Sequence, residues 1–336
     1  MRCREVRLAR VPDDAVTADC FAVVDTFVDA PVGSQVLVRL LRLGLNAGLA
    51  HRIGGAGTAY GPGIDVGDVP SSDAVVEVME SADERFHPGA LAVATLPWRT
   101  AAVVGADELR AIPAPQSAED LDAYLTILGH VGFTAYTGMI HVGDVQPEDV
   151  VYISGAAGGV GSCAVQFAKA RGATVIGVAG SAAKVARLID DLGADRAVNR
   201  HDGPAVDLLR SAAPDGITLY YDNVGGEQLE AALEVLTFGG RVIICGAVAG
   251  GSGSGAPANY RRLIYQELTM RGFTVTAHED LRPQFEHEVG GWLREGKVHS
   301  LHTVFNGIDA VPEAFESLLT GGSTGRVIVA IATPRG

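Results

Sequence analysis

The middle part of the chain alternates between short apolar runs and segments of helical spacing. Apolar, β-branched runs predict buried strands at 150–154, 174–178, 218–222, 241–245 and 269–275. Helical patterns fill much of the intervals, most clearly over 160–171, 183–192 and 228–236. Strands that alternate with helices in this way predict an α/β fold with a doubly wound parallel sheet, covered by helices on both faces.

The first part of the chain has a different pattern. Alternating or β-branched runs at 20–28, 35–43, 74–79 and 90–95 are separated by clusters rich in Gly, Pro and Asp. Short strands with such frequent turn signals predict a distorted barrel or sandwich. A helix is expected to begin near Ser117 and to continue through 121–128. Near the end of the chain, a helix at 311–320 precedes a strand at 326–331, which can return to the first domain.

The junction between the strand at 150–154 and the following helix carries three glycines at three-residue spacing, Gly155, Gly158 and Gly161. Glycine permits strained dihedrals and lets the backbone approach a ligand closely. The free N–H groups and the dipole at the helix start suit a diphosphate. The second strand at 174–178 completes a βαβ unit, and this context favours a dinucleotide-binding turn. The alternative is a glycine-rich turn that packs helix on sheet without a ligand.

Charge and cysteine usage limit the partners and the compartment. The chain has 26 Lys+Arg against 40 Asp+Glu, a net charge of -14, which argues against nucleic acid or an anionic membrane as the main partner. Cys3, Cys20, Cys163 and Cys245 are scattered and form no CxxC pair, so neither a disulfide framework nor a zinc cluster follows. The first residues contain no apolar core of signal-peptide length. We therefore expect a cytoplasmic protein with reduced cysteines.

Seven segments, in this order, carry a resemblance to a known family. They are GHVGFTAYTGM (129–139), ISGAAGGVGS (153–162), AGSAAKVARLIDDLGAD (179–195), DNVGGE (222–227), GRVIICGA (240–247), IYQELTMRGF (264–273) and WLREGKV (292–298). With this combination the chain resembles the zinc-free branch of the medium-chain dehydrogenases/reductases. That branch includes leukotriene B4 dehydrogenase/prostaglandin reductase, plant double-bond reductases and bacterial curcumin reductase. The resemblance is looser over the first hundred residues.

The resemblance implies a groES-like, β-barrel-type substrate domain (1–122 and 305–336) and a Rossmann NADP-binding domain (123–304). It also implies NADPH-dependent reduction of the C=C bond of an α,β-unsaturated carbonyl compound, by hydride transfer to the β-carbon, in an enzyme that is usually a homodimer. Three alternatives remain open because a fold does not determine its chemistry. They are a cyclase or tailoring enzyme on the same scaffold, a quinone reductase, and a non-catalytic NADPH-binding protein.

The end of the second strand of the βαβ unit indicates which nicotinamide cofactor is used. NAD sites normally end this strand with Asp or Glu, but here it ends in Ala179-Gly180-Ser181, without a carboxylate. Lys184 lies one turn into the next helix, and its family counterpart binds the 2′-phosphate of NADPH. Arg200 lies where the family has a tyrosine near the same phosphate. We expect NADPH to be preferred over NADH by at least tenfold, about 1.4 kcal/mol; the alternative is two solvated surface cations.

By the same resemblance, further cofactor contacts follow the ends of successive strands, where open α/β sheets bind ligands. They are Gly158, Gly159, Val160 and Gly161 of the pyrophosphate turn, Ser181, Asn223, Cys245 and Gly246 beside the nicotinamide, Phe273, Thr274 and Val275 near its carboxamide, and Ser323. Ser323 stands where relatives usually have Asn, so this contact would be shorter.

No catalytic side chain and no metal ligand are assigned. Relatives carry a tyrosine near the active site where this chain has about Gly251, and an aromatic residue where it has the Asn46–Gly48 stretch. The loss of two aromatic hydroxyls predicts a larger pocket and a bulky, natural-product-like substrate. Tyr60, Tyr260 and His278 are alternative proton donors, although each also fits a structural or surface role.

The candidate ligands in the first domain do not show the zinc-binding pattern of zinc alcohol dehydrogenases. They are Cys3, Cys20, His51 and His87.

Overall fold

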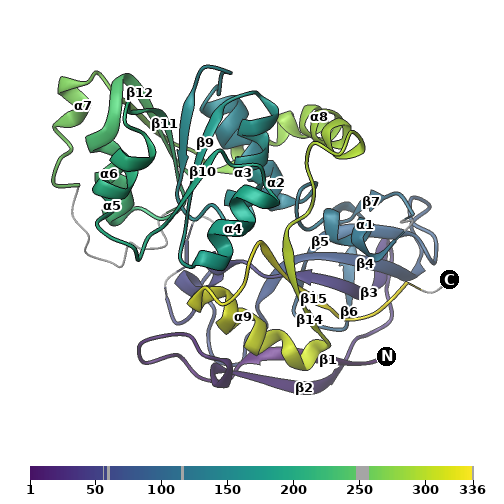
Figure 1. The fold of residues 1–336 in the computed structure, drawn as a ribbon. Helices are drawn as coiled ribbons and strands as arrows, with labels where there is room; N and C mark the ends of the chain where they lie inside the picture. Colours follow the sequence, from purple (N-terminus) through teal and green to yellow (C-terminus); the bar gives the residue numbers. More distant parts are fainter. Residues whose placement is uncertain (56, 59–60, 115–116, 247–256, 335–336) are drawn as a thin grey trace. The chain divides into compact units, whose positions relative to one another are not determined.

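The structure is a computed structural model that describes residues 1–55, 57–58, 61–114, 117–246 and 257–334 (Figure 1). Its contacts divide the chain into two compact units, Met1–Leu125 with His302–Gly336 and Thr126–Leu301. The first unit is therefore built from both ends of the chain and the second from its middle. The chain passes between the units after Leu125 and after Leu301. The domain boundaries expected from the sequence, 122/123 and 304/305, lie close to these two positions.

The first unit is organised by a largely antiparallel sheet. Its strands follow the order β14-β15-β3-β4-β5-β7, and β6 pairs with β3 beside this path. They are β3 (Gln35–Gly44), β4 (Ser71–Ser81), β5 (Leu91–Pro97), β6 (Ala101–Gly105), β7 (Arg110–Ile112), β14 (His302–Asn306) and β15 (Arg326–Ala330). A separate antiparallel pair is formed by β1 (Arg2–Leu8) and β2 (Phe21–Phe27). β15 pairs with β3, so the last strand rejoins the first part of the chain as predicted.

The core of the first unit centres on three aromatic rings. Trp98 lies 5.3 Å from Phe315 and 5.6 Å from Phe21 between ring centroids, and the Trp98 indole N–H donates to the Ser72 hydroxyl at 3.0 Å. Phe315 comes from α9 (Val311–Thr320), which packs its apolar residues into this core. The other helical segments are short: η1 (Ala18–Cys20), η2 (Ala47–Arg52), η3 (Ala106–Glu108), α1 (Ala118–Ala123) and η6 (Ile308–Ala310).

The second unit contains a fully parallel six-stranded sheet, which confirms the predicted doubly wound fold. The strand order is β10-β9-β8-β11-β12-β13. The strands are β8 (Val150–Ile153), β9 (Thr174–Ala179), β10 (Arg196–Asn199), β11 (Ile217–Asp222), β12 (Leu236–Ile244) and β13 (Thr269–Gly272). The order reverses between β8 and β11, and ligands bind at such a switch point in open α/β sheets.

Helices cover both faces of this sheet (Figure 1). α5 (Ala205–Ala212) and α6 (Gly226–Val235) share one apolar core with Tyr152, Ile176 and Val178. The opposite face carries α2 (His130–Tyr136), α3 (Gly159–Ala170), α4 (Ala182–Asp190) and α8 (Arg282–Arg294). Short segments complete the unit: η4 (Thr137–Val142), α7 (Arg262–Tyr265) and η5 (Val275–Leu281). None of the helices in the described residues has the length and apolarity that a membrane crossing requires.

Several elements differ from the sequence-based prediction. β1, β6, β7 and β14 were not predicted, and β12 begins at Leu236 and not at residue 241. β10 was not predicted, because this four-residue strand has only one neighbour and needs no long apolar run. β13 ends at Gly272 and not at Val275, because Thr274 begins the helical segment η5. The helix after Ser117 ends at Ala123 and not at Leu128, although the Ser117 hydroxyl and the Asp120 carboxylate cap its start as expected.

Helices α3 and α4 pack unusually close to their neighbours at two glycines. A Cβ on Gly161 of α3 would lie 2.2 Å from the Gly155 carbonyl oxygen and 2.8 Å from the Ala156 Cα. A Cβ on Gly177 of β9 would lie 2.9 Å from Leu188 Cδ1 of α4. Both distances are shorter than van der Waals contact, so the helices reach these positions only because the side chains are absent.

We expect Gly161→Ala to lower the free energy of unfolding by about 1–3 kcal/mol, because backbone must move to admit the methyl group. Gly203→Ala is the matched control, since its Cβ would make only ordinary contacts with Leu208, at 3.9 and 4.0 Å. Urea unfolding of both variants measures the difference. Equal unfolding midpoints for the two variants would contradict the steric argument.

Candidate cofactor-binding site

The turn between β8 and α3 has the geometry of an anion-binding helix start. Gly155 adopts a left-handed φ of +57° directly after the strand, and Gly158 caps the helix with extended backbone. The first turn of α3 contains no acidic residue. The N–H groups at the start of a helix have no acceptor within the helix and carry the positive end of its dipole. Gly159, Val160 and Gly161 therefore present their backbone N–H groups where a diphosphate could bind.

Two cations meet at the carboxyl end of β9. The guanidinium of Arg200 lies against Gly180, because a Cβ built on that glycine would be 3.3 Å from the arginine Nε and 3.4 Å from its Cζ. The Arg200 backbone N–H donates to the Ala179 carbonyl at 2.9 Å, which holds the residue beside the strand end. The Ser181 hydroxyl caps α4 by accepting from the Lys184 N–H at 3.3 Å.

The electrostatics of this strand end favour an anion. Burial lowers the pKa of the half-buried Lys184 ammonium, and the positive charge of Arg200 lowers it further. Two cations that repel each other are stabilised by an anion bound between or beside them. The missing side chain on Gly180 leaves the room that the Arg200 guanidinium occupies. Lys184 comes from the first turn of α4, and Arg200 comes from the loop after β10.

The end of β11 is tied to the phosphate-binding turn. The Asn223 amide Nδ2 donates to the Ser154 carbonyl at 2.7 Å, and the Asn223 backbone N–H donates to the Ser154 hydroxyl at 3.0 Å. The neighbouring Asp222 carboxylate is buried and accepts from the Ser154 hydroxyl at 3.0 Å. Asp222 was not among the predicted site residues. The available signal was a carboxylate at the end of a central buried strand.

Cys245 and Gly246 follow β12 on the neighbouring loop. Their backbone N–H groups both donate to the Asp222 carbonyl oxygen, at 2.8 and 3.0 Å. Burial raises the pKa of the Cys245 thiol to about 11, so the side chain is a neutral thiol at physiological pH. Cys245 therefore contributes a small, uncharged surface at this edge of the sheet, and it is not poised to act as a thiolate nucleophile.

Phe273, Thr274 and Val275 follow β13 and turn away from the sheet. The Phe273 ring packs on Gly138 of η4, where a Cβ would lie 2.7 Å from the ring and 2.7 Å from the Tyr221 hydroxyl. The Thr274 carbonyl accepts from the Ala277 N–H at 3.1 Å, and Val275 is buried. The backbone of this segment is thereby held at the carboxyl end of the last strand.

The structure thus places all but one of the predicted cofactor contacts at the carboxyl edge of one sheet. They follow β8, β9, β10, β11, β12 and β13 in the second unit: Gly158, Gly159, Val160, Gly161, Ser181, Lys184, Arg200, Asn223, Cys245, Gly246, Phe273, Thr274 and Val275. Ser323 belongs to the first unit, where it is buried between α9 and β15.

The candidate proton donors are only partly described. Tyr60 and Gly251 lie outside the described residues. Tyr260 is exposed on the turn before α7, and the His278 ring packs against the His141 ring at 5.3 Å between centroids. In the first unit, the Asn46 side chain accepts from the Gly48 N–H at 2.8 Å and caps η2. Asn46 therefore has a local structural role at the start of η2.

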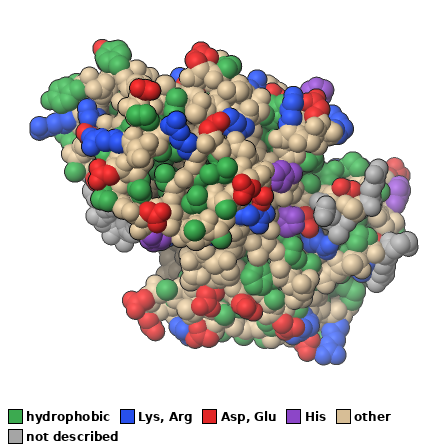
Figure 2. Space-filling model, in the orientation of Figure 1, with side chains coloured by type: hydrophobic (Ala, Val, Ile, Leu, Met, Phe, Trp, Pro, Cys, Tyr) green, Lys and Arg blue, Asp and Glu red, His purple; other side chains and the backbone are tan. Residues whose placement is uncertain are grey.

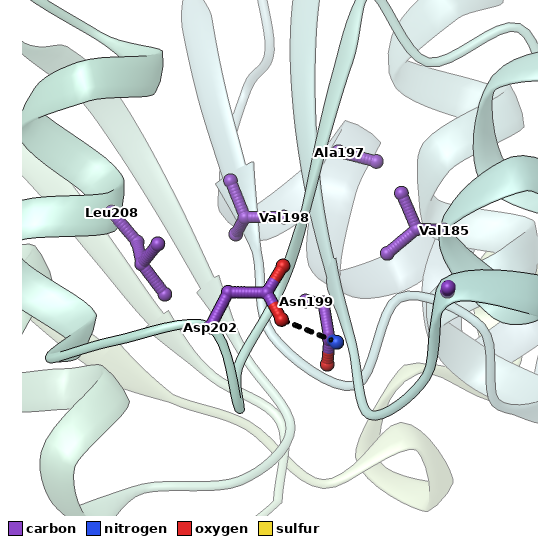
Figure 3. A pocket seen from close by; sticks show the side chains of 7 residues that line it. Val185, Ala197, Val198, Asn199, Asp202 and Leu208 are labelled. Carbon is purple, nitrogen blue, oxygen red and sulfur yellow. Dashed lines mark hydrogen bonds between the residues drawn. The ribbon is translucent and has the colours of Figure 1, made fainter.

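A pocket of about 240 Å³ lies next to the cations, at the outer edge of the sheet (Figure 3). Its walls come from α4, β10 and α5, with Val185, Val198 and Leu208 as apolar side chains. At one side the Asn199 amide donates to the Asp202 carboxylate at 2.8 Å (Figure 3). None of the predicted cofactor contacts lines this pocket, so we treat it as a neighbour of the site.

Two family models match the chain. A model described as a zinc-binding dehydrogenase matches residues 159–288, and one described as the N-terminal domain of an oxidoreductase matches residues 4–112. The first description mentions zinc. In the described parts of the chain, however, no group of three or more His, Cys, Asp or Glu residues could hold a metal ion.

Individual proteins match over most of the chain. An NADPH-dependent curcumin reductase of Escherichia coli (strain K12) is 29% identical and covers 98% of this chain and 97% of its own length. Prostaglandin reductase 1 of Rattus norvegicus is 35% identical, with 78% of this chain and 82% of its own covered. The crystal structure of CurA in complex with NADPH from Vibrio vulnificus has a TM-score of 0.92 at 27% identity, covering 98% of this chain and 100% of that one.

Proposed function

Because the chain belongs to the medium-chain dehydrogenase/reductase family, in the branch of the curcumin and prostaglandin reductases, we propose that it uses NADPH to reduce the C=C bond of an α,β-unsaturated carbonyl compound. The chain is an NADP-dependent oxidoreductase. The observation that carries the cofactor assignment is the pair Lys184 and Arg200, which converge on a strand end that lacks a carboxylate.

Residues of the second unit could bind successive parts of NADPH, one after another along the carboxyl edge of the sheet. Lys184 and Arg200 would hold the 2′-phosphate, and the N–H groups that start α3 would hold the diphosphate. The loop after β12 and the backbone after β13 would border the nicotinamide ring. NADPH, when bound, supplies the hydride. The protein then has to orient the alkene and stabilise negative charge on the carbonyl oxygen by hydrogen bonds.

We propose that the substrate is bulkier than a simple enal and has a polycyclic or polyketide-like shape. The support is Asn46, whose side chain caps η2 by accepting from the Gly48 N–H, in the stretch where the family resemblance places an aromatic residue. With the Cys245 thiol neutral at physiological pH, this chain offers no thiolate on the nicotinamide side. The proton for the α-carbon would come from water or from a donor that is not yet assigned.

Removal of either cation should weaken NADPH selectively. We expect Lys184→Ala and Arg200→Ala each to raise the NADPH Kd about tenfold and to leave the NADH Kd nearly unchanged, because only NADPH carries the 2′-phosphate. Fluorescence titration of both cofactors measures this. Lys297→Ala is the control, since Lys297 is an exposed lysine that pairs with Glu295 at 2.8 Å. Equal NADPH and NADH affinities in the wild type would refute the cofactor assignment.

A substrate panel tests the reaction. We expect NADPH consumption to accompany reduction of the C=C bond of large cyclic enones, with one saturated carbonyl product per NADPH oxidised. Absorbance at the reduced nicotinamide band and mass spectrometry of the product measure this. If small linear enals are reduced rapidly and no large enone is reduced, the proposal of a bulky substrate is wrong. Turnover of quinones alone would replace the ene-reductase proposal, and binding without turnover would favour a non-catalytic protein.

We further propose a homodimer in the cytoplasm. All four cysteines are free thiols, which suits a reducing compartment. The support for a second copy is an apolar surface beside the sheet edge at β13, where Phe238, Ile264 and Tyr265 are exposed by more than half (Figure 2 shows hydrophobic side chains over α7). Exposed apolar patches and open strand edges mark association surfaces.

A charge placed in this surface should separate the subunits. We expect Ile264→Glu to change the molar mass in light scattering from that of a dimer to that of a monomer, because a buried unpaired carboxylate strongly opposes association. Val32→Glu is the control: both side chains are 70% exposed, but Val32 lies in the first unit. A monomeric wild type, or an unchanged mass for Ile264→Glu, would exclude this interface.

A further inference from the structure

A single buried carboxyl oxygen organises the switch point of the sheet. Oδ1 of Asp222 accepts four hydrogen bonds: from the Ser154 hydroxyl at 3.0 Å, the Tyr220 hydroxyl at 2.7 Å, and the backbone N–H groups of Val224 and Gly225 at 2.9 and 2.8 Å. The residue is 1% exposed. A buried carboxylate is costly unless hydrogen bonds satisfy it, and bonds to a charged acceptor are the strong ones.

The same residue also holds the neighbouring loop through its backbone. The Asp222 carbonyl accepts from the N–H groups of Cys245 and Gly246 at the end of β12. Its side chain therefore links the β8–α3 junction to the β11–α6 turn, and its main chain links both to the loop after β12. These are three of the loops to which we have assigned cofactor contacts, although Asp222 itself is buried behind them.

We propose that Asp222 is a positioning residue for NADPH: through Ser154 and Tyr220 it sets the relative placement of the diphosphate-binding turn and the nicotinamide-side loops. This inference rests on the proposed function, because it assumes that these loops bind NADPH. Asp222 acts through the backbone that it holds and does not touch the cofactor. The sequence shows none of this, because Ser154 and Asp222 are 68 residues apart.

The sheet supplies a matched pair of tyrosines for the test. Tyr220 and Tyr152 stack on each other in the same core, with ring centroids 5.4 Å apart, and both are buried. Each hydroxyl donates one hydrogen bond to a side chain: Tyr220 to Asp222, and Tyr152 to the Gln228 amide oxygen at 2.6 Å; the Tyr220 hydroxyl also interacts with the Ser154 side chain. Burial and the Asp222 charge raise the Tyr220 pKa well above its usual range, so its hydroxyl stays a donor. Only the Tyr220 bond reaches the carboxylate.

The experiment compares Tyr220→Phe, Ser154→Ala and Tyr152→Phe with the wild type. NADPH and 2′-AMP are titrated against each protein, because 2′-AMP carries the 2′-phosphate end without the diphosphate or nicotinamide. We expect Tyr220→Phe and Ser154→Ala to raise the NADPH Kd about three- to tenfold, because only part of the free energy of the lost internal bond is coupled to the placement of the loops, and to leave the 2′-AMP Kd unchanged. Tyr152→Phe should leave both Kd values unchanged.

Urea unfolding and a conservative variant separate positioning from a general loss of stability. Tyr220→Phe should lower the unfolding midpoint more than Tyr152→Phe, because its lost acceptor is charged. NADPH binding is therefore compared where every variant is fully folded, and there a purely structural role would leave the NADPH Kd of both variants unchanged. Asp222→Asn retains an acceptor oxygen and should bind NADPH more tightly than Asp222→Ala, if the latter folds.

Unchanged NADPH affinity in Tyr220→Phe and Ser154→Ala would overturn the positioning role and leave the proposed function intact. A wild type that binds neither NADPH nor 2′-AMP would overturn both.

Discussion

The close contact between the start of α3 and the end of β8 is the constraint on which the proposed site depends. Gly161 of α3 packs on the Gly155 carbonyl at a separation that no Cβ could occupy, so the first turn of the helix lies against the turn that follows β8. With a side chain there, the first turn of α3 would stand away from the sheet, and its N–H groups would not meet the loops after β9 and β11. The left-handed φ of Gly155 makes the reversal possible.

The charged groups near this contact differ in burial: the cations are partly exposed, and the carboxylate is buried. Lys184 in the first turn of α4 and Arg200 after β10 both lie at the carboxyl end of β9, where the two cations favour an anion. Asp222 lies at the switch point, almost fully buried, and its carboxylate is satisfied by hydroxyl and backbone donors. The hydrogen bonds to the carboxylate fix the loops before any ligand binds, whereas the repulsion between the cations is relieved when a phosphate arrives. The two kinds of charge therefore have different roles: one orders the scaffold and the other selects the ligand.

The sequence predicted those parts of the fold that local patterns encode. Central strands of a parallel sheet are buried on both faces, so β8, β9 and β11 appear as continuous apolar runs. β10 was not predicted, because an edge strand of four residues needs no continuous apolar run. The residues of the candidate site could be named from strand ends and family motifs. Asp222 also stands at a strand end, but its role could not be predicted, because that role depends on partners that the sheet brings to it.

The amino-acid sequence by itself determined the alternation of strands and helices, the glycines of the turn and the absence of a carboxylate after β9, because each is a property of neighbouring residues. Tertiary structure alone decided which side chains meet: Arg200 against Gly180, Asp222 with Ser154, and Phe273 on Gly138. These pairs are separated by tens of residues in the chain, and no local periodicity specifies them. They form only when the sheet order brings the strand ends together, which is why the chemistry of the site emerges from the fold.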